Sequence, residues 1–192
     1  MTDDEVLAEF RAAGALLEGH FILSSGRHSP RYLQCARVLM NPRRAERLAT
    51  ALAAKLRTAG VEADCVVAPA MGGLIIGHEL ARALGLSSMF VERPAGRFEL
   101  RRGFALSPGE RVLLCEDVVT TGLSSREAIA AVTAAGGRVV HAAALVDRSN
   151  GAADLGVPFT PLVRLDVPSF PPDALPAELA ALPAVKPGSR AA

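Results

Sequence analysis

The feature that most constrains the fold of this chain is a repeated alternation of short apolar runs with helix-like patterns between residues 64 and 147. The apolar runs lie at 64–69, 88–92, 111–116 and 138–147, and helical spacing of apolar residues occurs at 73–84 and 124–135. Runs that are apolar throughout are expected where both faces of a sheet are covered, and strands interleaved with helices indicate parallel pairing. The alternation therefore predicts an α/β protein with a doubly wound, mainly parallel sheet.

Two further helices are predicted before this region. Apolar residues at helical spacing behind an acidic start predict a short helix over residues 4–13. A proline suited to the first helical turn, followed by a single apolar face, predicts a second helix over 42–59. The segment 20–34 mixes glycine, serine, proline and arginine, so we expect a loop that leads into a brief strand at Tyr32 and Leu33.

The end of the chain has a different composition. Eight of the 13 prolines lie beyond residue 150. Proline cannot donate to a strand ladder or continue a helix, so we expect this segment to wrap the surface and to end in a loose tail.

Charge, apolar run length and cysteine content exclude several classes of protein. The 21 lysines and arginines nearly balance the 20 aspartates and glutamates, so the bulk attraction to nucleic acid or to an anionic membrane is absent. The longest stretch without charged residues or histidine, 65–77, is shorter than the roughly 20 residues that cross a bilayer, and the acidic N-terminus lacks a signal-peptide pattern. Three widely spaced cysteines indicate neither a disulfide framework nor a metal site. We therefore expect a cytoplasmic protein that binds neither nucleic acid nor membranes.

One predicted strand end concentrates polar groups. The segment VLLCEDVVTTGLSS, residues 112–125, passes from an apolar strand to two carboxylates and then to hydroxyls around a glycine before the next helix. In open parallel sheets, ligands bind beyond the carboxyl ends of the strands. Glu116 and Asp117 suit the hydroxyls of a sugar or a hydrated Mg²⁺, whereas free amides and hydroxyls at a helix start suit a phosphate.

Each half of this segment also has an ordinary structural explanation. Acidic residues are common after strands, and Ser124 followed by Glu127 fits a helix capping box. The presence of both halves on one strand–loop–helix unit favours ligand binding. Other phosphate loops are absent, because the sequence contains neither GxxxxGK[ST] nor GxGxxG.

The whole unit resembles the phosphoribosyl diphosphate (PRPP) binding motif of type I phosphoribosyltransferases: an apolar strand, two acidic residues, two apolar residues, then threonine, a small residue, glycine and threonine or serine. The resemblance implies an α/β fold of that kind with a small N-terminal hood. It also implies that Glu116 and Asp117 hold the ribose side of PRPP, and that 120–124 hold its 5′-phosphate. The PRPP-binding residues implied are Glu116, Asp117, Val118, Val119, Thr120, Thr121, Gly122, Leu123 and Ser124.

The segment APAMGG, residues 68–73, lies between a predicted strand and a predicted helix. Its glycines would let backbone amides approach an anion, and a plain strand-to-helix turn explains them equally well. In type I phosphoribosyltransferases a loop at this place binds diphosphate. The resemblance therefore adds Gly72 and Gly73 to the PRPP site.

Four arginines lie close together between residues 90 and 104. Such a run is usually a solvated face. In the related enzymes a mobile basic loop at this place closes over the diphosphate, which implies that Arg93 and Arg97 bind PRPP. Many relatives have lysines here, whereas this chain has only Lys55 and Lys186, so Arg97 becomes the candidate catalytic cation beside Glu116 and Asp117.

Two further segments are similar to those of the orotate-specific phosphoribosyltransferases. Residues 19–32, GHFILSSGRHSPRY, resemble a pattern that helps enclose the base, and LVDR at 145–148 resembles a strand-end Asp-Arg whose arginine contacts orotate. A guanidinium can pair with the orotate carboxylate in a bidentate way, although without the resemblance a surface arginine in a turn is the better explanation of Arg148. The orotate-binding residues implied are Thr120, Arg148, Ser25, Gly26 and Tyr32.

The resemblance implies one domain over residues 1–165, with a hood at about 16–40 and a core at about 42–150, followed by a tail at 166–192. It implies an Mg²⁺-dependent transfer of phosphoribosyl from PRPP to N1 of orotate, forming orotidine 5′-phosphate and diphosphate in pyrimidine biosynthesis. The ion would arrive with PRPP near the acidic pair. A homodimer is also implied, in which loop 93–102 reaches the neighbouring site.

Two alternatives stay open at this point. A phosphoribosyltransferase of adenine type would differ at Arg148 and in the N-terminal segment. A PRPP-sensing regulator without activity would normally add a nucleic-acid-binding domain or a basic surface, for which this chain has neither the length nor the net charge.

Overall fold

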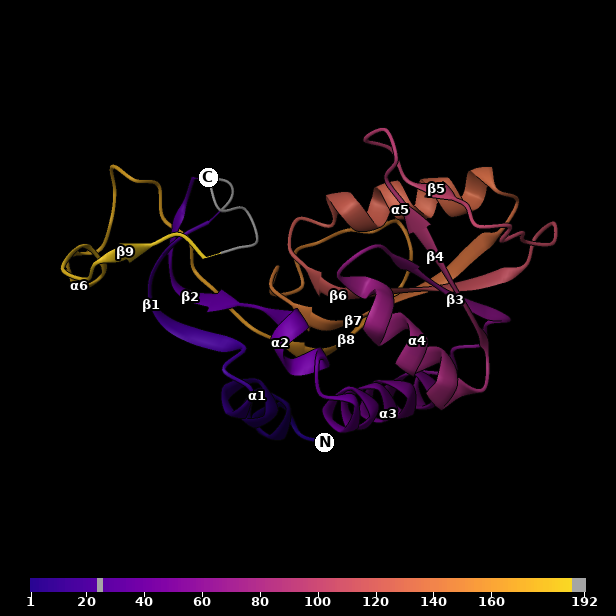
Figure 1. The fold of residues 1–192 in the computed structure, drawn as a ribbon, viewed down its shortest axis with the longest axis horizontal. Coiled ribbons are helices and arrows are strands. Elements are labelled where there is room, and N and C mark those ends of the chain that lie inside the picture. The colour runs from indigo at the N-terminus through magenta and orange to yellow at the C-terminus, as the bar shows by residue number, and fades with distance from the viewer. Residues whose placement is uncertain (24–25, 188–192) are drawn as a thin grey trace.

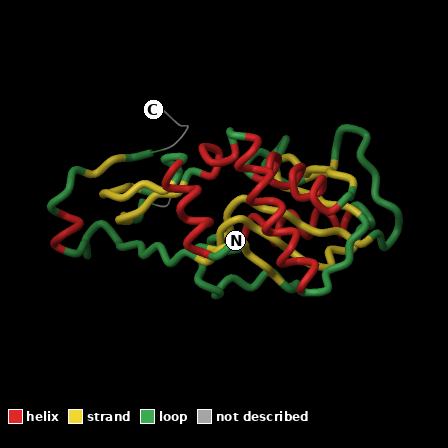
Figure 2. Tube along the Cα trace, turned by 90° about the horizontal axis from the view of Figure 1, so that it is seen from below, coloured by secondary structure: helices red, strands yellow, loops and turns green. Residues whose placement is uncertain are grey.

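The computed structural model of this protein describes residues 1–23 and 26–187. Its elements are α1 (Asp3–Ala12), β1 (Leu16–Ile22), β2 (His28–Leu33), α2 (Cys35–Leu39), α3 (Pro42–Thr58), β3 (Cys65–Pro69), α4 (Gly73–Leu84), β4 (Ser87–Glu92), β5 (Glu99–Leu100), β6 (Arg111–Val119), α5 (Leu123–Ala134), β7 (Arg138–Asp147), β8 (Phe159–Arg164), α6 (Ala177–Ala180) and β9 (Ala184–Val185). They form a six-stranded sheet and a three-stranded sheet that lie at opposite ends of the molecule (Figures 1 and 2).

The six-stranded sheet has the order β5-β4-β3-β6-β7-β8, and every neighbouring pair except β4–β5 is parallel. Apolar residues of α1, α3 and α4 pack on one face, and those of α5 pack on the other (Figure 1). This confirms the doubly wound, mainly parallel sheet predicted from the alternation. Because β6 is central, its carboxyl end lies between loops from both neighbouring strands, β3 and β7.

The structure differs from the sequence prediction at β6 and β8. The apolar run predicted a strand over 111–116, yet β6 continues to Val119, because its ladder with β7 extends to the pair Val119 and Asp147. The carboxylates of Glu116 and Asp117 are therefore held on a strand rather than in a loop. Prolines argued against a strand in the region of β8, but β8 is an edge strand, where a missing donor is tolerated.

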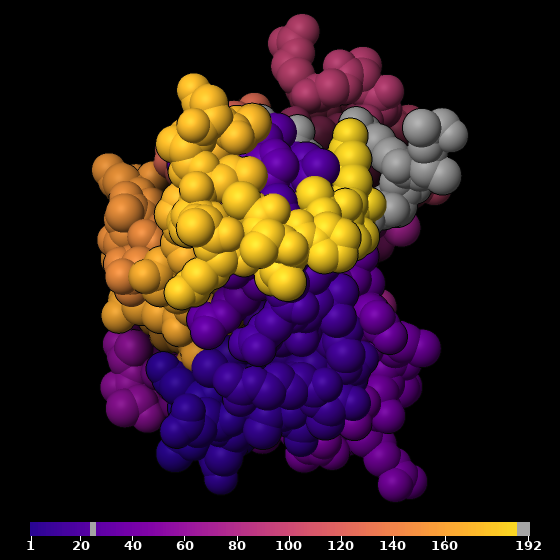
Figure 3. All heavy atoms as spheres, turned by 90° about the vertical axis from the view of Figure 1, so that its left-hand side faces the viewer, coloured from indigo at the N-terminus to yellow at the C-terminus, as the bar shows by residue number. Residues whose placement is uncertain are grey.

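The three-stranded sheet forms a hood from both ends of the chain. β1 pairs antiparallel with β2 and parallel with β9, and Phe170 forms a two-way backbone bridge with His28. His20 donates from Nδ1 to the carbonyl oxygen of Leu182 at 3.0 Å. Figure 3 shows the yellow C-terminal segment lying across the violet hood.

The hood includes residues that the sequence prediction assigned to a loop and to a C-terminal tail. The segment from 166 to 187 is part of the hood and not a loose tail, and β1 occupies positions where a loop was expected. No local pattern marks this pairing, because the partners in β1 and β9 are far apart in the sequence. Within the described ranges, no helix is both long enough and apolar enough to span a membrane.

Candidate active site

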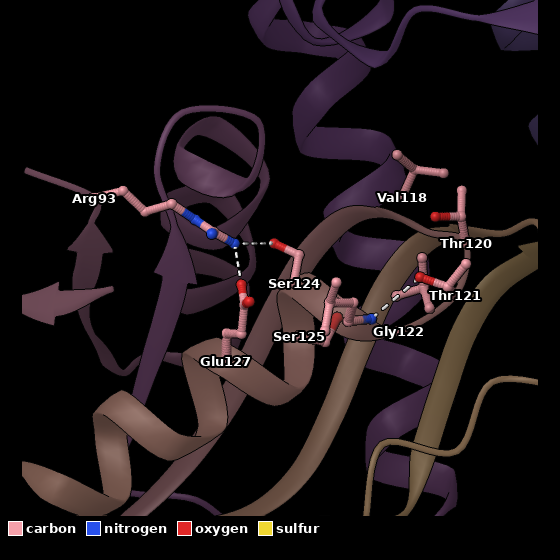
Figure 4. A pocket seen from close by; sticks show the side chains of 10 residues that line it. Arg93, Val118, Thr120, Thr121, Gly122, Ser124, Ser125 and Glu127 are labelled. Atoms are coloured by element: carbon pink, nitrogen blue, oxygen red, sulfur yellow. Dashed lines mark hydrogen bonds and ion pairs between the residues drawn. The ribbon is translucent and has the colours of Figure 1, made fainter. Parts of the chain in front are cut away.

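The carboxyl end of β6 opens into a cavity of about 280 Å³. Figure 4 shows the side chains around it, which come from the end of β6, the loop to α5, the first turns of α5 and Arg93, the residue after β4. The lining residues are Arg93, Val118, Val119, Thr120, Thr121, Gly122, Leu123, Ser124, Ser125 and Glu127. The structure thus brings together the residues assigned to a phosphate from the sequence, with Arg93 at one side.

The loop between β6 and α5 has the geometry of an anion site. Gly122 has φ +74° at the N-terminus of α5, a region that favours glycine, and a Cβ there would lie 2.5 Å from Cδ2 of Leu155. The backbone N–H of Leu123 donates to Oγ1 of Thr121 at 3.4 Å. The positive end of the helix dipole faces this turn, which favours a negatively charged ligand.

The capping-box explanation of Ser124 and Glu127 is wrong. The N-cap of α5 is Gly122, which has no side chain to make the box. Ser124 and Glu127 instead bind Arg93, whose Nη2 donates to Oε2 of Glu127 at 2.5 Å and to Oγ of Ser124 at 3.4 Å (Figure 4). The Arg93 guanidinium also lies 3.9 Å over the ring of Phe98.

The other arginines of the basic segment lie elsewhere. Arg102 pairs with Glu92 at 2.8 Å, and Arg101 lies 3.7 Å from the same carboxylate. Arg97 is exposed, and among the described residues it is not one that lines the cavity. Of this segment, the structure places only Arg93 at the cavity.

The two adjacent carboxylates differ in their surroundings. Glu116 is 6% exposed and accepts a hydrogen bond from Oγ of Ser125 at 3.3 Å. Burial, and next the charge of Asp117, raise the pKa of Glu116 to about 8. Asp117 is half-buried and accepts from the backbone N–H of Val118 at 2.9 Å, and burial raises its pKa as well. Sequence reasoning missed Ser125, for which only its place in the motif was a signal.

The loop between β3 and α4 packs against the acidic pair. A Cβ on Gly72 would lie 2.7 Å from Oδ1 of Asp117, and a Cβ on Gly73 would lie 2.9 Å from the carbonyl oxygen of Cys115. Contacts under 3.0 Å are not found for real Cβ atoms, so only glycine lets this loop approach β6 so closely. The two glycine-containing loops therefore flank the carboxylates from neighbouring strands.

Arg148 follows β7 directly and is anchored beside the cavity. Its backbone N–H donates to the carbonyl oxygen of Val119 at 2.8 Å. Its Nε is buried and has no hydrogen-bond partner within the described residues, and burial lowers the pKa of its guanidinium. Tyr32 and Cys35 interact electrostatically with it. The guanidinium is thus a partly buried cation, and its Nε has no hydrogen-bond partner among the described residues, so it could donate to a planar anion.

The remaining residues assigned to the base from the sequence differ in placement. Tyr32 lies on β2 near Arg148, with its ring centroid 5.8 Å from that of Phe21. Thr120 is exposed and lines the cavity. Gly26 is exposed in the turn between β1 and β2, and Ser25 lies outside the described residues. The structure therefore brings Thr120, Tyr32 and Arg148 to one end of the sheet.

Glu116→Gln is expected to remove a pH dependence of stability. Because folding raises the Glu116 pKa from 4.5 to about 8, the stability associated with its protonated form is fully present below pH 4.5 and is lost as the pH rises through about 8. Thermal unfolding without metal or substrate, from pH 5 to 9, should show wild type losing stability relative to the glutamine variant. Glu178→Gln, at an exposed position of α6, serves as the control. A constant difference between wild type and Glu116→Gln across this range would contradict the expectation.

Known proteins are similar to this chain along its whole length. The phosphoribosyl transferase domain family matches residues 35–156, which include the acidic pair, the phosphate loop and Arg148. The orotate phosphoribosyltransferase of Rhizorhabdus wittichii is 73% identical and covers 100% of this chain and 98% of its own, and that of Novosphingobium aromaticivorans is 70% identical, covering 100% and 99%. The crystal structure of orotate phosphoribosyltransferase from Aeropyrum pernix matches with a TM-score of 0.67 at 28% identity, covering 83% of this chain and 93% of its own.

Proposed function

The chain belongs to the orotate phosphoribosyltransferase family, and on this premise we propose that its strand-end cleft transfers the phosphoribosyl group of PRPP to N1 of orotate. The products are orotidine 5′-phosphate and diphosphate, a step of pyrimidine biosynthesis. The observation that carries the proposal is that Arg148 is hydrogen-bonded through its backbone to Val119, which lines the phosphate cavity, and that its buried Nε has no partner among the described residues. Adenine has no carboxylate to pair with that guanidinium, so the adenine alternative is disfavoured.

The reaction is a displacement at the anomeric carbon of ribose, in which the C–N bond to orotate forms as the C–O bond to diphosphate breaks and the N1 proton of orotate is released to water. We assign the 5′-phosphate to the loop 120–124, whose amides and hydroxyls surround the cavity. The ribose hydroxyls then fall beside Glu116 and Asp117 at the end of β6. Positioning and charge stabilisation supply most of the rate in this arrangement.

Arg148 and Thr120 hold orotate in this proposal, and Arg148 interacts electrostatically with Tyr32 of the hood. Gly72 and Gly73 present the loop after β3 to the diphosphate. Arg93 lies on the phosphate cavity of its own chain, so Arg97, exposed in the loop between β4 and β5, is the candidate to meet the diphosphate.

Mg²⁺ is the proposed cofactor. Glu116 and Asp117 supply the carboxylate oxygens that suit it, and both carboxylates have raised pKa values that a nearby cation would offset. Within the described residues no group of three or more His, Cys, Asp or Glu side chains could cage a metal, so the ion would be held mainly by PRPP. When bound, it neutralises the diphosphate leaving group.

We further propose a cytoplasmic homodimer in which loop 93–102 reaches the partner's site. Cys35, Cys65 and Cys115 are all buried free thiols, which suits a reducing compartment. Residues 94–97 are exposed, so this part of the loop is free to extend beyond its own chain. Light scattering on the purified protein would give the mass of the assembly.

The test of the function is an incubation with PRPP, Mg²⁺ and orotate while the absorbance of orotate is followed. The expected result is loss of the orotate signal that requires both PRPP and the protein. Failure to convert orotate, together with turnover of adenine under the same conditions, would refute the assignment.

Glu127→Gln is expected to tighten the binding of inorganic phosphate about two- to fivefold. Glu127 neutralises Arg93 at the cavity, and breaking a partly exposed ion pair of this kind costs below about 1 kcal/mol. A phosphate at the loop would then meet a free guanidinium. Titration calorimetry measures the effect, with Glu46→Gln as a matched control, because Glu46 forms an exposed ion pair with Arg82 at 3.1 Å away from the site. Weaker phosphate binding by Glu127→Gln would show that Glu127 orients Arg93 instead of competing for it.

A further inference from the structure

Arg126 joins two loops through a single nitrogen atom. It is an exposed residue in the first turn of α5, and its Nη1 donates to the carbonyl oxygen of Thr121 at 3.2 Å and to that of Asp154 at 2.7 Å. Thr121 belongs to the loop assigned to the phosphate. Asp154 belongs to the loop that follows Arg148, the residue assigned to the base.

The loop from Arg148 to Asp154 is held as one hydrogen-bonded unit. The fully buried carboxylate of Asp147 accepts from the backbone N–H of Ser149 at 2.8 Å, from its hydroxyl at 2.6 Å and from the backbone N–H of Gly151 at 3.0 Å. Oγ of Ser149 in turn accepts from the backbone N–H of Ala153 at 2.9 Å. A constraint applied at Asp154 is therefore transmitted to the backbone that carries Arg148.

The same loop packs against the phosphate loop at Gly122. Leu155 is 3% exposed, and a Cβ on Gly122 would lie 2.5 Å from its Cδ2 and 3.0 Å from Nη1 of Arg126. The joint between the two loops thus has an apolar half at Leu155 and a polar half at Arg126.

The bond to Thr121 also bears on the anion site. The Thr121–Gly122 peptide is trans, so its C=O and N–H point in opposite directions. Because the carbonyl oxygen is directed to Arg126, the N–H of Gly122 points away from Arg126. Gly122 lines the cavity, whereas Arg126 is not among the described residues that do. The guanidinium therefore acts on the phosphate loop from outside the cavity.

We propose that Arg126 is a positioning residue that holds the phosphate loop and the Arg148 loop at a fixed separation, so that the sugar phosphate and the base are presented to one another in register. The inference rests on the proposed function, because it needs both loops to bind their substrates. Arg126 touches neither substrate in this arrangement and acts through the backbone.

A simple charge effect is the competing explanation. A cation near the phosphate loop would attract phosphate over a distance, and salt would screen that attraction. It would act on the orotate carboxylate in the same way, so its effect on either substrate would vanish at high salt. The joint, by contrast, ties Arg126 to the Arg148 loop through Asp154, so its loss should affect both substrates at low and at high salt.

The experiment compares Arg126→Gln and Arg126→Lys with wild type. Arg57→Gln is the matched control, because Arg57 is also exposed and its Nη2 donates to the carbonyl oxygen of Ala83 at 2.6 Å, away from the site. The Michaelis constants for orotate and for PRPP are measured at low and high salt, together with kcat, and calorimetry gives the affinity for inorganic phosphate at the same two salt concentrations.

Arg126→Gln is expected to raise the KM for orotate and for PRPP about tenfold each, with weaker phosphate binding at both salt concentrations, since hydrogen bonds from a charged donor are lost. Arg126→Lys should keep KM values and a phosphate affinity close to those of wild type, because one ammonium group can replace the one nitrogen that makes both hydrogen bonds. A lower kcat with both KM values unchanged would indicate mere loss of folded protein and would overturn the proposal. So would weaker phosphate binding that returns to the wild-type value at high salt, with or without a change in the KM for orotate.

Failure of the proposal for Arg126 can be distinguished from failure of the proposed function. If wild type failed to convert orotate, the function would be refuted, and the phosphate affinity of Arg126→Gln would still test the joint at Thr121. If wild type converted orotate and Arg126→Gln matched it in every measurement, only the role proposed for Arg126 would be refuted.

Discussion

Replacing Arg148 with methionine is expected to raise the KM for orotate about 10²- to 10³-fold while leaving the affinity for inorganic phosphate unchanged. The Arg148 guanidinium is partly buried and carries a buried Nε without a partner among the described residues, so an incoming carboxylate would meet a largely desolvated charge. Removing one member of such a pair commonly costs about 2 to 5 kcal/mol. Steady-state kinetics with orotate as the varied substrate measure the effect.

The same variant should not lose stability. Burial lowers the pKa of the Arg148 guanidinium, which shows that the folded protein disfavours the charge there. Methionine keeps much of the apolar stem and removes the unpartnered donor, so the Tm is expected to stay equal or to rise by a few degrees. Arg57→Met, at an exposed site away from the cleft, controls for the loss of a surface arginine. An unchanged KM for orotate, or a marked fall in Tm, would contradict the role assigned to Arg148.

Asp117→Asn is expected to lower kcat/KM for PRPP about 10²- to 10³-fold while the fold stays intact. The asparagine keeps the shape of the side chain, and its oxygen can still accept from the N–H of Val118, so the end of β6 is preserved. What is lost is a negative charge beside the ribose, where positive charge develops as the diphosphate leaves. Removing one such electrostatic group from an active site commonly costs this much in rate.

Circular dichroism and thermal unfolding check the fold of Asp117→Asn, and Asp173→Asn, at an exposed position of the C-terminal segment, is the matched control. The burial that raises the pKa of Asp117 should make the neutral side chain no less stable than the carboxylate. Normal kinetics with PRPP in this variant would show that the ribose lies elsewhere.

The core of the fold and the centre of the site could be predicted because both depend on patterns of residues that are close together in the sequence. The apolar runs around β3, β6 and β7 are continuous since these strands are covered on both faces, and β6 runs straight into the acidic pair and the phosphate loop. A motif contained in one strand, loop and helix keeps its geometry wherever the unit is placed. For that reason the sequence alone predicts the strand, loop and helix that the structure contains as β6, residues 120–122 and α5.

Interactions between distant segments were not predictable in the same way. The hood strand β9 pairs with β1 across most of the chain length, and nothing in the short segment at 184–185 marks a strand. Glu127 fitted a local capping box by spacing, yet it binds Arg93, which comes from β4. The prolines around β8 argue against a strand unless that strand lies at the edge of the sheet, and the sequence does not show that β8 does.

By itself, the sequence determined the layered α/β class and the chemistry at the end of β6, because spacing along the chain is enough to define a strand end and the helix that follows it. Tertiary structure alone decided which cation faces the phosphate loop, how deeply Glu116 and Arg148 are buried, and that Arg126 links the loops after β6 and β7. These properties depend on distances between residues that are far apart in the chain. Burial and pairing arise only when the sheet brings those residues together.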